Sequence, residues 1–201
     1  LPIFNENSKA IQDVMLKTLT SKLKNSEAVL ANTRTEESVS VGVKKQGTAV
    51  EDTVIKELGV RLEKVGTKLI LDFQGISFYR LGETEVTPAG AKALVNFVQA
   101  YLPFAGVNQL GIRAFTDNLP VIQQKNRKFS DNLELSALRA VAAMRILQKA
   151  GIPLWKMRLG GYGELNTTAE ELRGIAQQEG RGFALARKVI LVIEPEVRDH
   201  P

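Results

Sequence analysis

The stretch IRAFTD at residues 112–117 and the segment DNLELSALRA at residues 131–140 decide the fold. Apolar side chains alternate with other residues in the first stretch, which predicts a half-buried strand with Asp117 just past its end. The second segment predicts the start of a helix capped by Asp131 or Ser130, and Asp131 with Glu134 has the spacing of a capping box. The two segments therefore predict a strand, a polar loop and a helix in succession.

Asp117 and Arg139 are the candidate binding residues of this unit, since Arg139 lies about two turns inside the predicted helix. If the helix packs against the strand, the two side chains flank one cleft. A carboxylate accepts from an ammonium group and a guanidinium group clamps a carboxylate, so the pair suits a zwitterionic amino acid end. Spacing alone leaves open, and favours, an internal ion pair or two solvated surface charges.

The composition indicates a globular protein, with 44% apolar and 24% charged residues in 201. The net charge of +5 is mildly basic, and the longest basic cluster is only Lys125, Arg127 and Lys128 in a predicted loop. No dense basic stripe is interleaved with aromatic residues, so we expect no nucleic acid partner. The chain has no run of about 18 apolar residues, and its start at Leu1-Pro2 lacks the features of a signal peptide, which suggests a fragment or a processed form.

The chain contains few residues that are suited to catalysis. There is no cysteine, and the single histidine, His200, stands next to the C-terminus. Histidine-based triads and thiolate chemistry are thereby excluded, and the carboxylates show no pair at a fixed spacing. We expect no enzyme, no metal site and no cofactor.

The first third of the chain is predicted to be mainly helical. An amphipathic helix is expected over Ser8–Leu30 with Ser8 as its cap, packing on its own domain or on a second copy. Residues 32–47 are expected to form a polar linker or a weak edge strand, and Val50–Val65 again has helical spacing.

From Thr67 onward the pattern is that of one α/β domain. The predicted elements are a strand at 69–73, an extended turn region at 76–82, a helix at 88–102, the strand before Asp117, a helix at 131–150, a strand at 157–161, a polar and partly helical insert at 168–179 and a strand at 187–193. This order gives two βα units and an added strand, hence an α/β sandwich with helices on one face. In the second helix the expected buried positions are Leu135, Leu138, Ala142 and Ile146, with Arg139 one step off this stripe and its charged head at the rim.

Four ordered motifs resemble the landmarks of the OmpA-like peptidoglycan-binding domain. Thr116-Asp117 resembles its TD motif, 132–140 its NxxLSxxRA motif, 161–164 its GYGE motif and 187–189 its RRV motif. The resemblance covers roughly residues 67–195, and four motifs in order are far more specific than one. Within the family, residues 116–120, 129–136 and 179–181 are most similar to the MotB subgroup, the stator B-subunits of flagellar motors.

The resemblance implies a two-layer α/β sandwich with a mixed sheet, and a site that binds the peptide stem of peptidoglycan without catalysis. The implied site residues are Thr116, Asp117, Asn132, Leu135, Arg139 and Arg187. Asp117 would accept from the ammonium of the stem's diamino acid and Arg139 would clamp its carboxylate. Asn132 would hold the binding loop, and Arg187 would support the site from the last strand.

This sequence departs from the family pattern at two places near the site. Ala114-Phe115 stands where the family has Gly-His, and Ala186 stands where it has Asn before the final basic pair. Both charged binding residues remain.

The function that the resemblance implies is anchoring of an ion-driven flagellar motor to the cell wall. Residues 1–66 would be the linker or regulatory segment, 67–195 the binding domain and 196–201 a tail. Such a protein would be a homodimer in the periplasm, joined to the ion-channel A-subunit through a membrane segment outside this sequence. The alternative is another envelope protein with the same domain, either an outer-membrane or lipoprotein tether or the stator-like subunit of a phage-defence motor.

Overall fold

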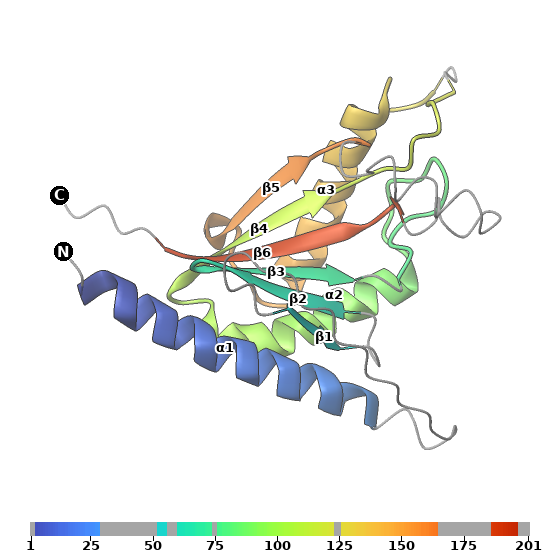
Figure 1. Ribbon diagram of the computed structural model, residues 1–201. Coiled ribbons are helices and arrows are strands. Elements are labelled where there is room, and N and C mark those ends of the chain that lie inside the picture. Colours follow the sequence, from blue (N-terminus) through green and yellow to red (C-terminus); the bar gives the residue numbers. More distant parts are fainter. Residues whose placement is uncertain are drawn as a thin grey trace.

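The structure is a computed structural model that describes residues 3–28, 52–55, 60–73, 76–122, 126–164 and 186–196. Within this part of the chain, six strands form one twisted sheet in the order β1-β2-β3-β6-β4-β5, with helices packed along it (Figure 1). The strands are β1 (Asp52–Ile55), β2 (Val60–Val65), β3 (Lys68–Phe73), β4 (Asn108–Ala114), β5 (Met157–Gly161) and β6 (Val189–Pro195). β4 and β5 run parallel, whereas all other neighbouring pairs run antiparallel. The predicted mixed α/β sheet is confirmed.

The two domain helices lie where the sequence predicts them and carry the predicted caps. α2 (Pro88–Tyr101) starts at Thr87, whose side chain accepts a hydrogen bond from the backbone N–H of Gly90. α3 (Asn132–Lys149) starts at Asp131, whose carboxylate accepts from the N–H of Glu134 at 2.8 Å. Two short 3-10 turns complete these connections, η2 (Leu102–Phe104) after α2 and η3 (Leu154–Lys156) before β5.

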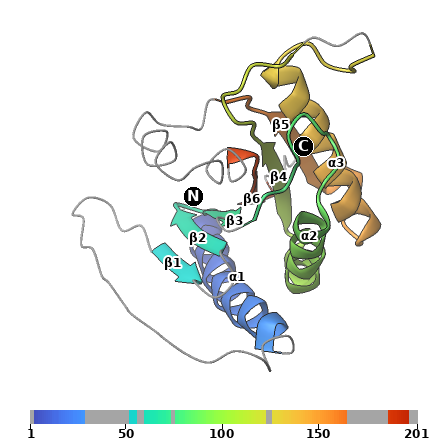
Figure 2. The same ribbon diagram turned by 90° about the vertical axis from the view of Figure 1, so that its right-hand side faces the viewer.

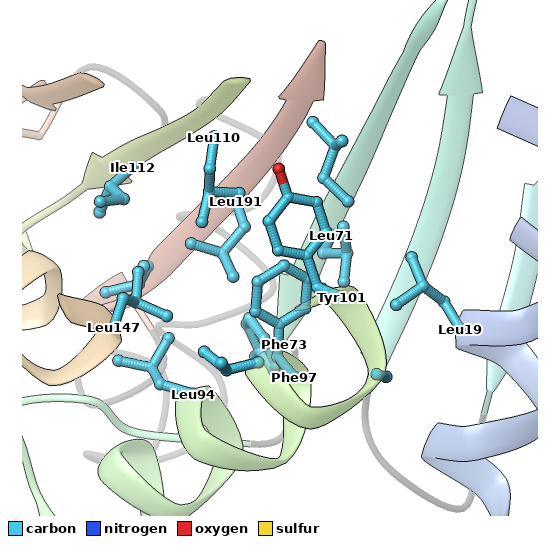
Figure 3. Packing of buried hydrophobic residues seen from close by; sticks show 14 of the residues in the cluster. Leu19, Leu71, Phe73, Leu94, Phe97, Tyr101, Leu110, Ile112, Leu147 and Leu191 are labelled. Carbon is cyan, nitrogen blue, oxygen red and sulfur yellow. The ribbon is translucent and has the colours of Figure 1, made fainter. Parts of the chain in front are cut away.

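The core lies between one face of the sheet and the helices (Figure 2). Alternate strand residues point into it, among them Leu71 and Phe73 of β3 and Leu191 of β6, and they meet Phe97 of α2 and Leu147 of α3 (Figure 3). The residues between them on the strands form a small second cluster on the opposite face, made of Ile70, Phe115, Ile190 and Val192. The period of two in the strands therefore separates a helix-covered face from a second face.

α1 (Ile3–Ala28) is one continuous helix that packs against the same core. Leu19 points from it into the cluster in Figure 3. The helix starts five residues before the predicted cap at Ser8. A buried hydrogen bond of 3.1 Å from the Gln12 amide to the Asn108 side chain ties α1 to β4, and an ion pair of Asp13 with Lys64 ties it to β2. α1 thus packs on its own domain, as the more common of the two alternatives predicts.

The helix expected over Val50–Val65 is wrong, because this segment contains strands β1 and β2. Val60 and Leu62 are buried while Arg61 and Glu63 between them are less so, which is the alternation of a strand. The β-branched residues of the segment also favour strands over helices. A two-residue turn with Gly66 at φ +60° joins β2 to β3, so the sheet begins before the boundary expected between residues 66 and 67.

Two predicted features lie outside the described residues. These are the linker or edge strand at 32–47 and the partly helical insert at 168–179.

Candidate functional site

Asp117 lies in the turn after β4 and pairs with Arg187, which precedes β6. Arg187 Nη1 donates to Asp117 Oδ2 at 2.7 Å, and both side chains are nearly buried. The other carboxylate oxygen, Oδ1, accepts from the backbone N–H of Leu119 at 3.2 Å. The position is dictated by topology, since β4 and β6 are neighbours and their registered pairs end at Ala114 and Val189. Sequence reasoning paired Asp117 with Arg139, whereas the structure places Arg187 in direct contact with it.

Arg139 is fully inside the protein, with only 1% of its surface exposed. The prediction that its head stays at the rim is wrong, because the buried stripe of α3 is Leu135, Ser136, Arg139, Ala140, Ala143 and Leu147. This stripe is shifted by about one position from the predicted one. Small residues define it: α3 approaches β5 so closely that an added Cβ on Gly161 would lie 2.3 Å from the backbone N of Ala137. A pattern based on large apolar residues overlooks such a contact.

The guanidinium of Arg139 is held by the turn that precedes α2. Its Nε donates to the carbonyl of Glu83 at 2.9 Å, and its Nη2 donates to the carbonyl of Arg80 at 3.0 Å. Its centre lies 4.8 Å from the centroid of the Tyr79 ring. The third nitrogen, Nη1, is buried and has no hydrogen-bond partner among the described residues. Leaving a buried guanidinium N–H without an acceptor raises the free energy of the folded protein. Nη1 is therefore the atom of this group at which an added acceptor would be most favourable.

Burial sets the electrostatics of this group. It lowers the pKa of Arg139 to about 10, an effect that Arg187 reinforces and that Tyr79 and Asp117 oppose. These opposing effects show that Asp117 and Arg187 lie within electrostatic range of Arg139. Two guanidinium groups and one carboxylate therefore share a largely desolvated site, where charge interactions are strong.

Asn132 and Thr116 hold the loops around the site. The Asn132 amide donates to the carbonyl of Leu119 at 3.1 Å, to Glu164 Oε2 at 3.0 Å and, at 3.5 Å, to the carbonyl of Asp117. Thr116 donates its backbone N–H to Gly163 at 2.8 Å. Its hydroxyl is buried without a partner within the described part of the chain.

Leu135 and the two departures from the family pattern contribute packing and backbone contacts next to the site. Leu135 is buried in α3 and supports its packing. Phe115 faces the second cluster and stacks on Tyr162, with ring centroids 5.3 Å apart. Ala186 accepts a backbone hydrogen bond from Lys188. Phe115 thus packs with the second cluster of the sheet.

The sequence reasoning missed the turn at residues 79–86 as part of the site. Tyr79 and Val86 form an isolated bridge, and Gly82 takes φ +67° between them. Backbone carbonyls of this turn carry no sequence signature, although Gly82 signals the turn itself. Ser136 was also missed as a contact: its hydroxyl accepts from the N–H of Gly163 at 2.9 Å and joins the LSxxRA and GYGE motifs.

Among the described residues, no group of three or more His, Cys, Asp or Glu side chains could hold a metal ion. No helix in the same ranges is long and apolar enough to cross a membrane.

Comparison with solved structures identifies the class of fold. No protein-family model matches the sequence, and no curated protein does. A putative MotB-like protein from Desulfovibrio vulgaris matches 98% of this chain and 96% of its own at a TM-score of 0.57 and 20% identity. The cell wall anchor of the T6SS from Pseudomonas aeruginosa matches 71% of this chain and 92% of its own, at a TM-score of 0.53 and 18% identity. The fold is therefore the OmpA-like α/β sandwich that the ordered motifs predict.

Within that class, the chain resembles the periplasmic domains of MotB. The periplasmic domain of Helicobacter pylori MotB matches 72% of this chain and 84% of its own at a TM-score of 0.57 and 18% identity. A longer MotB periplasmic domain matches 88% of this chain and 86% of its own, at a TM-score of 0.60 and 17% identity. At these identities the likeness establishes the fold, and function must be argued from the site.

Proposed function

We propose that this chain binds the peptide stem of peptidoglycan without catalysis, and that Asp117 and Arg139 clamp the zwitterionic end of its diamino acid. The ammonium of that end would share the Asp117 carboxylate with Arg187. Its carboxylate would accept from Arg139. Thr116, Asn132 and Leu135 would complete the site by holding its walls.

The observation that carries the proposal is the unpartnered Nη1 of Arg139. Every other nitrogen of this guanidinium has a carbonyl acceptor, while Nη1 is buried and unpaired in the described part of the chain. A ligand carboxylate would satisfy it with a charge-assisted hydrogen bond. The charge balance among the described residues supports an anionic partner at this point, because Asp117 pairs with Arg187 and is the carboxylate that acts on the charge of Arg139.

The wider role that we propose is anchoring of a flagellar stator to the cell wall. The MotB likeness spans nearly the whole chain for one relative, N-terminal helix included. On this proposal the chain lies in the periplasm, acts as a homodimer and is joined to the ion-channel A-subunit through a membrane segment beyond this sequence. Residues 1–66, which contribute strands β1 and β2 to the sheet, would form the regulatory segment and residues 67–195 the wall-binding domain.

A sedimentation assay with purified peptidoglycan tests the site. Wild type should co-sediment, whereas Asp117→Ala and Arg139→Ala should remain in the supernatant. Lys156→Ala and Glu196→Ala are the matched controls, because this buried ion pair of 2.6 Å lies at the opposite end of the sheet, before β5 and after β6. Equal retention of all five proteins would rule out the proposed site. Competition by the free diamino acid, and none by its N-acetylated form, would support the ammonium contact.

A second candidate role is wall anchoring of a different envelope machine. The likeness to a protein described as the cell wall anchor of the T6SS favours it. Both roles use the same site, so wall binding alone does not separate them. Deleting the gene in the source organism separates the two roles. Loss of swimming with intact flagella supports the stator role, and normal swimming supports the role in another envelope machine.

A further inference from the structure

Tyr79 contacts both arginines of the proposed site, although no sequence motif includes it. Its ring lies under the Arg139 guanidinium, with the centroid 4.8 Å from Cζ. Its hydroxyl donates to the backbone carbonyl of Arg139 at 2.8 Å. Its own carbonyl accepts from Arg187 Nε at 2.8 Å. One residue therefore touches the backbone and side chain of one arginine and the side chain of the other.

The location of Tyr79 makes these contacts rigid. The side chain is fully buried, and its ring packs beside Phe78 with centroids 6.4 Å apart. The bridge to Val86 fixes its backbone. Burial raises the pKa of the phenol, so the hydroxyl stays protonated and continues to donate to α3. A ring fixed in this way also fixes the plane against which the guanidinium lies.

The cation–π contact with Tyr79 offsets part of the free-energy cost of burying the Arg139 guanidinium. Arg139 is desolvated, and its three nitrogens have only two acceptors among the described residues. An aromatic face is the neutral surface that attracts a desolvated guanidinium group, more strongly than it would in water. With the ring on one side and the carbonyls of Arg80 and Glu83 at two nitrogens, the direction of Nη1 is determined.

We infer that Tyr79 is a positioning residue of this site: its ring sets the orientation of the Arg139 guanidinium, and its carbonyl sets the position of Arg187. This inference rests on the proposed function for its binding readout, while the orientation itself does not depend on any ligand. Tyr79 acts on the ligand through the arginines and does not touch it. Its ring, more than its hydroxyl, determines affinity for a carboxylate.

The experiment compares Tyr79→Phe, which keeps the ring, with Tyr79→Leu, which removes it, in the full chain. Binding to purified peptidoglycan should weaken about tenfold in Tyr79→Leu, the order of one desolvated cation–π contact, and change less than about twofold in Tyr79→Phe. Tyr101→Leu is the matched control. Tyr101 is equally buried in the same core and stacks on Phe97 at 5.2 Å, so its loss should lower stability and leave affinity unchanged (Figure 3).

A spectroscopic readout tests the orientation without any ligand. In ¹⁵N-labelled protein the ring current should shift the Arg139 Nε–H proton upfield, and the resonance is assigned by its absence from Arg139→Met. Tyr79→Phe should keep the shift and Tyr79→Leu should abolish it. An ordinary Nε–H position in wild type overturns the inference even if Tyr79→Leu does not fold. Equal peptidoglycan affinity of folded Tyr79→Leu and folded Tyr101→Leu also overturns the inference. If wild type binds no peptidoglycan, the proposed function fails, and the ring-current shift still decides the positioning.

Discussion

Replacing Gly161 with alanine would place a methyl group inside the backbone of α3. The new Cβ would lie 2.3 Å from the N of Ala137, 2.6 Å from Ser136 Oγ and 2.7 Å from the Cα of Ala137. Two of these atoms are main chain, so α3 must retreat by about 1.1 Å to restore an ordinary contact of 3.4 Å. We expect a loss at the upper end of the overpacking range, about 3 kcal/mol of unfolding free energy. The melting temperature should then fall by roughly 6–12 °C in a chain of this size.

The same displacement should weaken peptidoglycan binding, because Arg139 lies two residues beyond Ala137 on the displaced helix. Urea unfolding followed by circular dichroism measures the stability, and co-sedimentation measures the binding. Gly111→Ala is the control: on the neighbouring strand β4 its Cβ would meet Val192 at 3.5 Å, an ordinary contact. If the two variants unfold within about 0.5 kcal/mol of each other, the close contact between α3 and β5 is refuted.

Three further predictions concern charge. Arg187→Met leaves Asp117 buried without its ion-pair partner and should lower the unfolding free energy by about 3–5 kcal/mol, and adding Asp117→Asn should restore part of it in urea titrations. Lys156→Met, which removes a buried cation, should be more destabilising than Lys68→Met, whose exposed ion pair contributes less than about 1 kcal/mol. Burial lowers the pKa of Arg139 from 12.5 to about 10, so only between these two pH values does the folded chain release this proton while the unfolded chain holds it. The Arg139 contribution to stability should therefore rise with pH above about 10, measured as the difference between wild type and Arg139→Met in urea unfolding.

The domain strands and both domain helices could be predicted because local patterns and caps agree with the final packing. Thr87-Pro88 and Asp131 start their helices where the sequence predicts it, since their caps depend on neighbours within three residues. The helix predicted over Val50–Val65 is wrong for the opposite reason. The strand identity of this segment depends on the pairing of β1 with β2 and of β2 with β3, and the spacing of apolar residues along the segment does not reveal such pairing.

The structure brings residues of the candidate site together, but their geometry could not be predicted from the sequence. The motifs contain Asp117, Arg139, Asn132 and Arg187, which the structure brings together at one end of the sheet. The choice of Arg187 as the direct partner of Asp117 follows from the adjacency of β4 and β6, a fact of topology. Carbonyl acceptors such as that of Glu83 belong to any residue type, so no sequence pattern marks them.

Arg139 illustrates how the stability of the core would compete with the proposed binding site. Lowering its pKa from 12.5 to about 10 corresponds to a cost of about 3 kcal/mol for keeping this charge inside the folded chain. Two carbonyl hydrogen bonds and the Tyr79 ring offset part of that cost, and neither of them satisfies Nη1. A methionine of similar length would fill the same space without a charge, and such replacements are often neutral or stabilising. The other buried residues of α3 include Ala140, Ala143 and Leu147, so a charged side chain is an exception on this face. The group is therefore best explained by what it can bind: a carboxylate that reaches Nη1 would recover in binding the free energy that the fold gives up.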